Sequence, residues 1–176
     1  MALIRRGDAT VPTAQPRDNR PKGKTIIVFD GDMDKVLAIF VIVNGALTMG
    51  RPVTMFFTFW GLTALCRQEN IPLKKSLIER MVGWMLPRGE GKLKLSKMNM
   101  GGMGTAMMKD IMNDKSFDSL ETMMHKAMVN GVKIIVCSMS MDVMGIHPEE
   151  LIDGVEIGGV GTYLGDAEKS DVNLFI

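Results

Sequence analysis

The sequence predicts an α/β protein, a three-layer α/β/α domain built on a mostly parallel five-stranded sheet. Short apolar runs rich in β-branched residues alternate with segments of helical spacing, which is the pattern of consecutive βαβ units. The apolar runs show little polar alternation, as expected of strands that are covered on both faces. A chain of 176 residues is long enough to bury the core of one such domain.

The elements follow one another in a regular order. The expected strands are residues 24–29, 53–59, 132–137, 155–157 and 172–176. Helical spacing is found over residues 36–47, 73–86, 118–128, 138–144 and 162–169. Together they predict parallel strands joined by right-handed crossovers.

Local signals set several helix ends. Asp32 or Asp34 should lie in the first turn of the first helix, where carboxylates interact favourably with unpaired N–H groups. A short helix carrying Cys66 should follow the second strand. Asp118 and Glu121 form a D-x-x-E variant of the capping box at the start of a later helix.

Later signals mark the second half of the domain. Asn130-Gly131 is a typical helix end, directly before the third strand. His147 followed by Pro148 should cap and start one more short turn. His125, in the preceding helix, has no obvious catalytic spacing to other residues and is expected on the surface.

Residues 69–116 interrupt this order. We expect a single domain over residues 24–176, with a helical, methionine-rich insertion at about 69–116 and a disordered tail at 1–23. The methionines of the insertion are Met98, Met100, Met103, Met107, Met108 and Met112. We expect them to pack in the core or in an oligomer interface, because methionine adapts to irregular surfaces.

Composition excludes several functional classes. Lys and Arg number 21 against 20 Asp and Glu, so the net charge of +1 gives no electrostatic case for binding nucleic acid. Two cysteines and no signal-like N-terminal run fit a reducing compartment, and we expect a cytoplasmic protein. The apolar runs are shorter than the ~20 residues of a spanning helix. A peripheral membrane contact stays open.

Cys137 is the most informative residue for chemistry. It ends the expected third strand, and a helix begins at Ser138. A thiol at that junction faces the unpaired N–H groups and the positive end of the helix dipole, which favour the nucleophilic thiolate. A buried structural thiol is the alternative, since unpaired cysteines are often buried.

Other residues should share the edge of the sheet with Cys137, because ligands of such sheets bind at the carboxyl ends of the strands. These expected neighbours are Asp30, Gly31, Asp32, Ser138, Ser140, Gly158, Gly159 and Gly161. The glycines could cradle an anion or form a tight turn, and they lack the spacing of a dinucleotide fingerprint. We expect no cofactor and no metal site.

Two short motifs suggest other functions, a phosphatase and a Cu(I) site. Asp30-Gly31-Asp32 after an apolar strand resembles the start of a phosphatase of the haloacid dehalogenase type, although capping and turn formation explain it more simply. Met98, Met100 and Met103 are closely spaced thioethers, which are soft ligands for Cu(I). Packing is the expected role of these methionines.

Several stretches together resemble the DsrE/DsrF-like family of small sulfur-relay proteins, in the branch often labelled "peroxiredoxin family". They are residues 31–35, 53–62, 97–100, 137–145 and 153–156. The resemblance implies a flavodoxin-like domain, oligomers, and a cysteine, Cys137, that accepts sulfane sulfur as a persulfide. It also implies partners such as rhodanese-like or TusA-like sulfur carriers.

The resemblance leaves two questions open. It gives no role to Cys66, and it fits a non-catalytic binding or scaffold protein of the same fold as the alternative function. The peroxidase label has no chemical support, because Lys133-Ile134-Ile135-Val136 stands before Cys137 in place of a P-x-x-x-T-x-x-C setting. The function expected is a sulfurtransferase or sulfur carrier.

Overall fold

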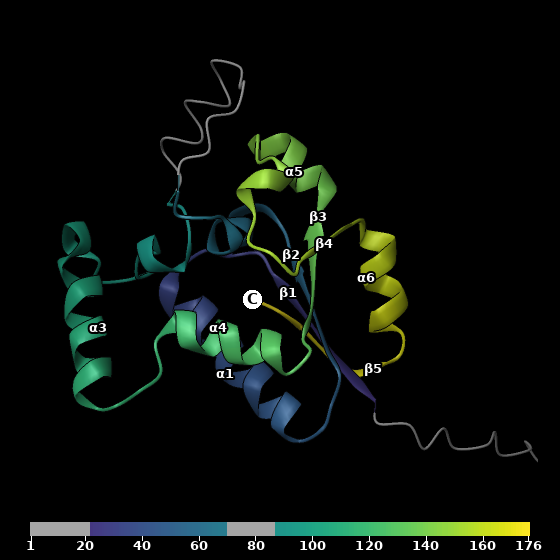
Figure 1. Ribbon diagram of the computed structural model, residues 1–176, viewed down its shortest axis with the longest axis horizontal. Coiled ribbons are helices and arrows are strands. Elements are labelled where there is room, and N and C mark those ends of the chain that lie inside the picture. The colour runs from purple at the N-terminus through teal and green to yellow at the C-terminus, as the bar shows by residue number, and fades with distance from the viewer. Residues whose placement is uncertain (1–21, 70–86) are drawn as a thin grey trace, which may run out of the picture.

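The computed structural model describes residues 22–69 and 87–176, which form a five-stranded sheet with helices on both faces (Figure 1). The strands are β1 (Gly23–Val28), β2 (Val53–Phe57), β3 (Lys133–Cys137), β4 (Glu156–Gly158) and β5 (Ser170–Phe175). They lie in the order β4-β3-β2-β1-β5, and each neighbouring pair is parallel. The expected three-layer α/β fold is confirmed, with a sheet that is parallel throughout.

The helices divide between the two faces of this sheet. The α-helices are α1 (Met33–Thr48), α3 (Met103–Asp114), α4 (Leu120–Val129), α5 (Ser138–Met144) and α6 (Val160–Ala167). Short 3₁₀ helices are η1 (Phe59–Leu65), η2 (Glu90–Lys92), η3 (Met100–Gly102) and η4 (Pro148–Glu150). Helices α1 and α4 pack together on one face and α6 lies on the other, while α3 stands apart from the sheet (Figure 1).

The side of each helix follows from the strand order. The connections β1 to β2 and β2 to β3 advance in the same direction, so right-handed crossovers put α1 and α4 on one face. The connection from β4 to β5 runs back across the sheet, which puts α6 on the opposite face. The central strands β1, β2 and β3 are therefore covered on both sides, and this explains why they are mostly apolar. The edge strands β4 and β5 are largely exposed.

The core has two parts because side chains alternate along each strand. The larger part lies on the α1 and α4 side and includes Ile134 and Val136. The smaller part lies on the α6 side and consists of Phe56, Ile135, Cys137 and Tyr163. Cys137 thus points toward α6, away from the larger core.

Two expectations about helix ends are wrong. Cys66 does not lie in a helix: η1 ends at Leu65, and Cys66 is extended and forms an antiparallel bridge with Leu151. The capping residue of α4 is Ser119, whose Oγ accepts a hydrogen bond from the N–H of Thr122 at 3.2 Å. Asp118 instead forms an ion pair with Lys126.

The first helix begins earlier than its apolar spacing indicates. Helix α1 starts at Met33 with Asp32 as the N-cap residue, but the Asp32 side chain makes no capping hydrogen bond. The carboxylate of Asp34 accepts hydrogen bonds from the N–H and the hydroxyl of Ser96, so it joins the helix to a distant loop. The helix expected over residues 73–86 lies outside the described residues, as does the tail up to residue 21.

The described part of the expected insertion has two different environments. Leu93 is buried in the larger core, and the N–H of Met33 donates to the carbonyl of Lys94 at 2.8 Å. Farther along, Thr105 is the buried residue of α3. Met98, Met100 and Met103 are exposed, so the expectation that they pack in the core is wrong.

Candidate functional site

The candidate site is built around the junction of β3 and α5. Cys137 is the last residue of β3 and the N-cap residue of α5, with φ −68° and ψ 111°. It pairs in register with Gly158, the last residue of β4. The β-branched run 134–136 forms the strand, and the helix begins at Ser138, where its spacing predicts it.

The thiol of Cys137 is almost covered. The residue is 5% exposed and packs in the cluster with Phe56 from β2 and Tyr163 from α6. The rings of Phe56 and Tyr163 lie 5.3 Å apart at 32°. The thiol makes no capping hydrogen bond to the first turn of α5. The side chains of this cluster therefore shield the thiol from solvent.

The second thiol lies elsewhere. Cys66 is buried in the larger core, where its Sγ is 3.5 Å from the carbonyl oxygen of Leu62. Cys137 belongs to the smaller cluster on the α6 side of the sheet. The sheet separates the two thiols, so this fold does not bring them together.

The acidic residues at the end of β1 form their own cluster. Lys35 forms ion pairs with Asp30 and with Asp32, the latter at 2.9 Å. Hydrogen bonds from Lys35 to Asp30 and then Asp32 raise the pKa of the Lys35 ammonium, against a smaller opposing effect of burial. These carboxylates are partners of a lysine two strands away from Cys137 in the sheet order.

Gly31 has a packing role in that cluster. A Cβ at Gly31 would lie 2.5 Å from the carbonyl oxygen of Trp60 and 2.6 Å from Oγ1 of Thr63. The turn after β1 can therefore approach η1 only if this position carries no side chain. Asp30, Gly31 and Asp32 share the carboxyl edge with Cys137, as expected, but the structure does not bring them to the thiol.

The two serines after Cys137 have different environments. Ser138 is exposed. Ser140 is fully buried, and its hydroxyl lies 2.7 Å from the hydroxyl of Thr58, which follows β2. This hydrogen bond ties α5 to the end of the neighbouring strand. Thr58 had no signal in the sequence, because its partner comes from 82 residues away.

Of the expected glycines, Gly158 lies beside Cys137. Gly158 pairs with it in register, and a Cβ at Gly158 would lie 3.0 Å from Cγ2 of Ile135. Gly159 is the N-cap residue of α6, and a side chain at Gly159 or Gly161 would meet no atom within 4 Å. The start of α6, the helix that carries Tyr163 of the Cys137 cluster, therefore has no side chain at two positions.

The structure also contains a pocket beside α5 and β4 that the sequence does not predict. It has a volume of about 250 Å³ and is lined by Ser138, Met141, Asp142, Gly145, Ile146, His147, Pro148 and Ile157. The N–H of His147 donates to the carboxylate of Glu150 at 3.0 Å, in line with the expected start of a turn at Pro148. Nε2 of His147 is buried without a hydrogen-bond partner among the described residues.

The described residues were also compared with the requirements of a metal site and of a membrane-spanning helix. Within residues 22–69 and 87–176, there is no group of three or more His, Cys, Asp or Glu side chains placed to hold a metal ion. Over the same ranges, none of the helices has both the length and the apolar character needed to cross a bilayer.

Solved structures with a similar fold have very different sequences. The YchN protein of E. coli matches with a TM-score of 0.50 and 15% identity, over 88% of this chain and 99% of that one. A protein of unknown function from Methanobacterium thermoautotrophicum matches with a TM-score of 0.51 and 12% identity, over 88% of this chain and 99% of that one. These likenesses show the fold alone.

Sequence relatives are more informative about the family. The uncharacterized protein YrkE of Bacillus subtilis is 46% identical over 155 residues, which cover 88% of this chain and 97% of that protein. The sulfur carrier protein DsrE2 of Allochromatium vinosum is 34% identical over 162 residues, covering 88% and 98%. The model of the DsrE/DsrF/DrsH-like family matches residues 21–175. This chain belongs to the DsrE/DsrF/DrsH-like family.

Proposed function

We propose that this chain is a sulfur-relay protein that accepts sulfane sulfur as a persulfide on Cys137 and passes it to the thiol of a partner. Family membership and the 34% identical relative named a sulfur carrier support the relay role. The observation that carries the assignment to Cys137 is its position, at the carboxyl end of β3 and the start of α5. Unpaired N–H groups at a helix start favour an anionic sulfur atom.

The proposed reaction is a thiol exchange with no net oxidation or reduction. The Cys137 thiolate attacks the outer sulfur of a donor persulfide, an S–S bond forms to Cys137, and the donor's own S–S bond breaks. The donor leaves as a thiolate and takes up a proton. In the second step a partner thiolate attacks the outer sulfur on Cys137, and Cys137 returns to its original state.

Access controls the first step. Because Cys137 is 5% exposed, a donor sulfur can reach it only if the cover formed by Phe56 and Tyr163 opens. The first turn of α6 contains Gly159 and Gly161, which carry no side chains to resist such a movement. We infer that displacement of this turn admits the donor.

The receiving thiol should come from another molecule. Cys66 lies in the core on the opposite face of the sheet, so it cannot take the sulfur from Cys137 within one folded chain. Rhodanese-like and TusA-like carriers are the proposed partner classes, and a homo-oligomer working in the cytoplasm is the proposed form. The reducing cytoplasm keeps such thiols available.

Mass spectrometry of the intact chain tests this function. After incubation with glutathione persulfide, we expect one adduct of about 32 Da, the mass of one transferred sulfur atom. The adduct should be lost in Cys137→Ser and retained in Cys66→Ser. If neither variant nor wild type gains the adduct, the chain is a non-catalytic member of the fold. If the adduct is lost only in Cys66→Ser, the assignment to Cys137 is wrong.

A further inference from the structure

Three methionines before and at the start of α3 expose their side chains to solvent. Met98, Met100 and Met103 are 72%, 69% and 65% exposed. Burying a methionine side chain stabilises a fold, and none of these three side chains is buried. Packing within the described part of the chain therefore does not explain these residues.

The backbone that carries them is a tight turn. The N–H groups of Gly102 and Gly104 both donate to the carbonyl of Asn99, at 2.7 and 3.2 Å. A Cβ on Gly104 would lie 1.9 Å from the carbonyl oxygen of Met98, so these two backbone segments touch. The turn therefore places the backbone of Met98 against Gly104, the residue after Met103, with Met100 on the turn between them.

This turn is held in a strained form. Met98 and Met100 have φ values of +57° and +43°, a left-handed conformation that is unfavourable for a residue other than glycine. Thr105 fixes the turn, because its buried hydroxyl donates to Oδ1 of Asn99 at 3.0 Å and accepts from the N–H of Leu95 at 3.2 Å. Backbone strain that is fixed in this way gathers at ligand sites.

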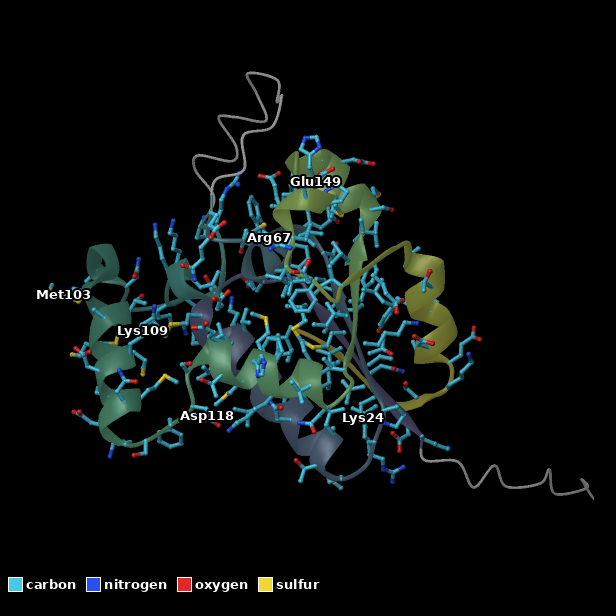
Figure 2. The ribbon with its side chains drawn as sticks, in the orientation of Figure 1. Lys24, Arg67, Met103, Lys109, Asp118 and Glu149 are labelled. Carbon is cyan, nitrogen blue, oxygen red and sulfur yellow. The ribbon has the colours of Figure 1, made fainter. Side chains whose placement is uncertain are left out.

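The donor atoms of the turn are of one chemical kind. From Lys97 to Met108 the sequence contains no Cys, His, Asp or Glu. Thioethers are soft neutral ligands that suit Cu(I), whereas Mg²⁺ and Ca²⁺ prefer oxygen. Residues 99–102 form a four-residue turn, whose ends lie within about 7 Å, and Met98 and Met103 flank it. The three rotatable bonds of each methionine would let the sulfur atoms converge on one ion. Met103 faces away from the sheet, open to solvent (Figure 2).

We propose that Met98, Met100 and Met103 form a thioether site for Cu(I). Each sulfur donates a lone pair to the ion, and binding releases no proton and transfers no electron. The affinity should therefore be the same at about pH 6 and pH 8, unlike that of a thiolate site, which rises with pH. The site lies on the α3 side of the molecule, apart from Cys137, and its existence is independent of sulfur relay.

The test uses the full chain with Cys66→Ser and Cys137→Ser, because thiolates would otherwise bind Cu(I). Cu(I) is titrated against the chromogenic chelator ferrozine, and we expect one ion per chain. Replacing Met98, Met100 and Met103 together by Leu, which preserves size, should lower the affinity at least about tenfold, or 1.4 kcal/mol. Circular dichroism checks that this variant is folded.

A matched control and a second readout keep the result decisive. Met49 and Met139 are 75% and 60% exposed but stand singly, so replacing both by Leu should leave the affinity unchanged. With ¹³C-methyl methionine in the otherwise unreplaced chain, Ag(I) should shift the Met98, Met100 and Met103 methyl signals. Loss of affinity in the control, shifts spread to Met49 and Met139, or no bound Cu(I) would overturn the proposal.

Discussion

If Cys137 carries the persulfide as proposed, its reactivity depends on what covers the sulfur atom as much as on the charge that the helix start stabilises. Phe56 and Tyr163 pack against it from a strand and from α6, and the residue is 5% exposed. A donor sulfur atom can reach this thiol only after the aromatic side chains move aside. Opening of the aromatic cover is therefore part of the chemistry at this residue.

Removing the aromatic ring should expose the thiol. In a Cys66→Ser chain, we expect Tyr163→Ala to raise the rate of Cys137 alkylation by iodoacetamide about tenfold, which corresponds to ~1.4 kcal/mol less for local opening. Quenched samples analysed by intact mass give the rate. Tyr163→Phe keeps the ring and should react as the parent does. An unchanged rate in Tyr163→Ala would mean that this side chain does not control access.

Residue patterns could locate Cys137 but not its surroundings. The run 134–136 and the helical spacing after it define the junction, because both are local signals. The strand order is not local, so the pattern could not tell that β2 separates Asp30 and Asp32 from the cysteine. Tyr163 covers the thiol from α6, the helix between β4 and β5, which lie at opposite edges of the sheet. Only the complete strand order shows that this helix lies on the Cys137 side.

At the scale of elements, η4 depends on one buried carboxylate. Glu150 is almost fully buried, forms a 2.6 Å ion pair with Arg88, and accepts the N–H of His147. Glu150→Ala would leave the Arg88 charge without this partner and should lower the free energy of unfolding by about 3–5 kcal/mol. Urea denaturation measures the loss.

The neighbouring residue is a control for the Glu150 prediction. Glu149 lies on the same turn but points outward at the rim of the molecule (Figure 2). Its replacement by Ala should change the free energy of unfolding by no more than about 0.5 kcal/mol. Equal effects of the two replacements would show that the buried ion pair does not stabilise this turn.

The contact between α1 and the loop before α3 should depend on pH. Burial raises the pKa of Asp34, but the hydrogen bonds from the hydroxyl and the N–H of Ser96, the backbone hydrogen bond of Asp34 and the charge of Lys35 together lower it by more. The net pKa therefore lies below the usual value. A carboxyl group of this kind stabilises the fold above its unfolded pKa, and the contribution is lost as pH falls through the folded pKa.

Asp34→Ala measures that contribution. We expect the variant to lose about 1 kcal/mol of unfolding free energy at pH 7 and progressively less as pH falls below about 5. Urea denaturation at several pH values measures the difference in unfolding free energy between the parent and the variant. Ser96→Ala removes the hydroxyl that donates to Asp34, so it should also make the unfolding free energy less dependent on pH. A difference that stays constant down to about pH 3 would contradict this account of the contact.

Element types were predictable from the sequence, but several ends were not. Apolar runs predict all five strands to within about two residues of their ends, most clearly for β1, β2 and β3, which are mostly buried. The D-x-x-E pattern predicts Asp118 as the cap of α4, but Ser119 is the cap, and Asp118 forms an ion pair with Lys126. Both residue types can cap a helix, so only the fold decides between adjacent candidates.

At the scale of the whole molecule, the sheet divides the chemistry of this chain into separate regions. Cys137 lies on the α6 side, Cys66 lies in the larger core beside η1 and Leu151, and the exposed methionines lie at or just before the start of α3. A sulfur atom held on Cys137 therefore has no route to Cys66 while the sheet is intact. Sulfur should enter and leave through one thiol, in contact with other molecules.

Site-resolved mass spectrometry during transfer tests this most directly. The folded chain is loaded with glutathione persulfide, given an excess of a small acceptor thiol, and digested at intervals after alkylation. We expect the extra sulfur on the Cys137 peptide alone, and its loss as the acceptor gains one sulfur atom. Sulfur that accumulates on Cys66, or that stays on Cys137 without passing to the acceptor, would contradict the proposed relay.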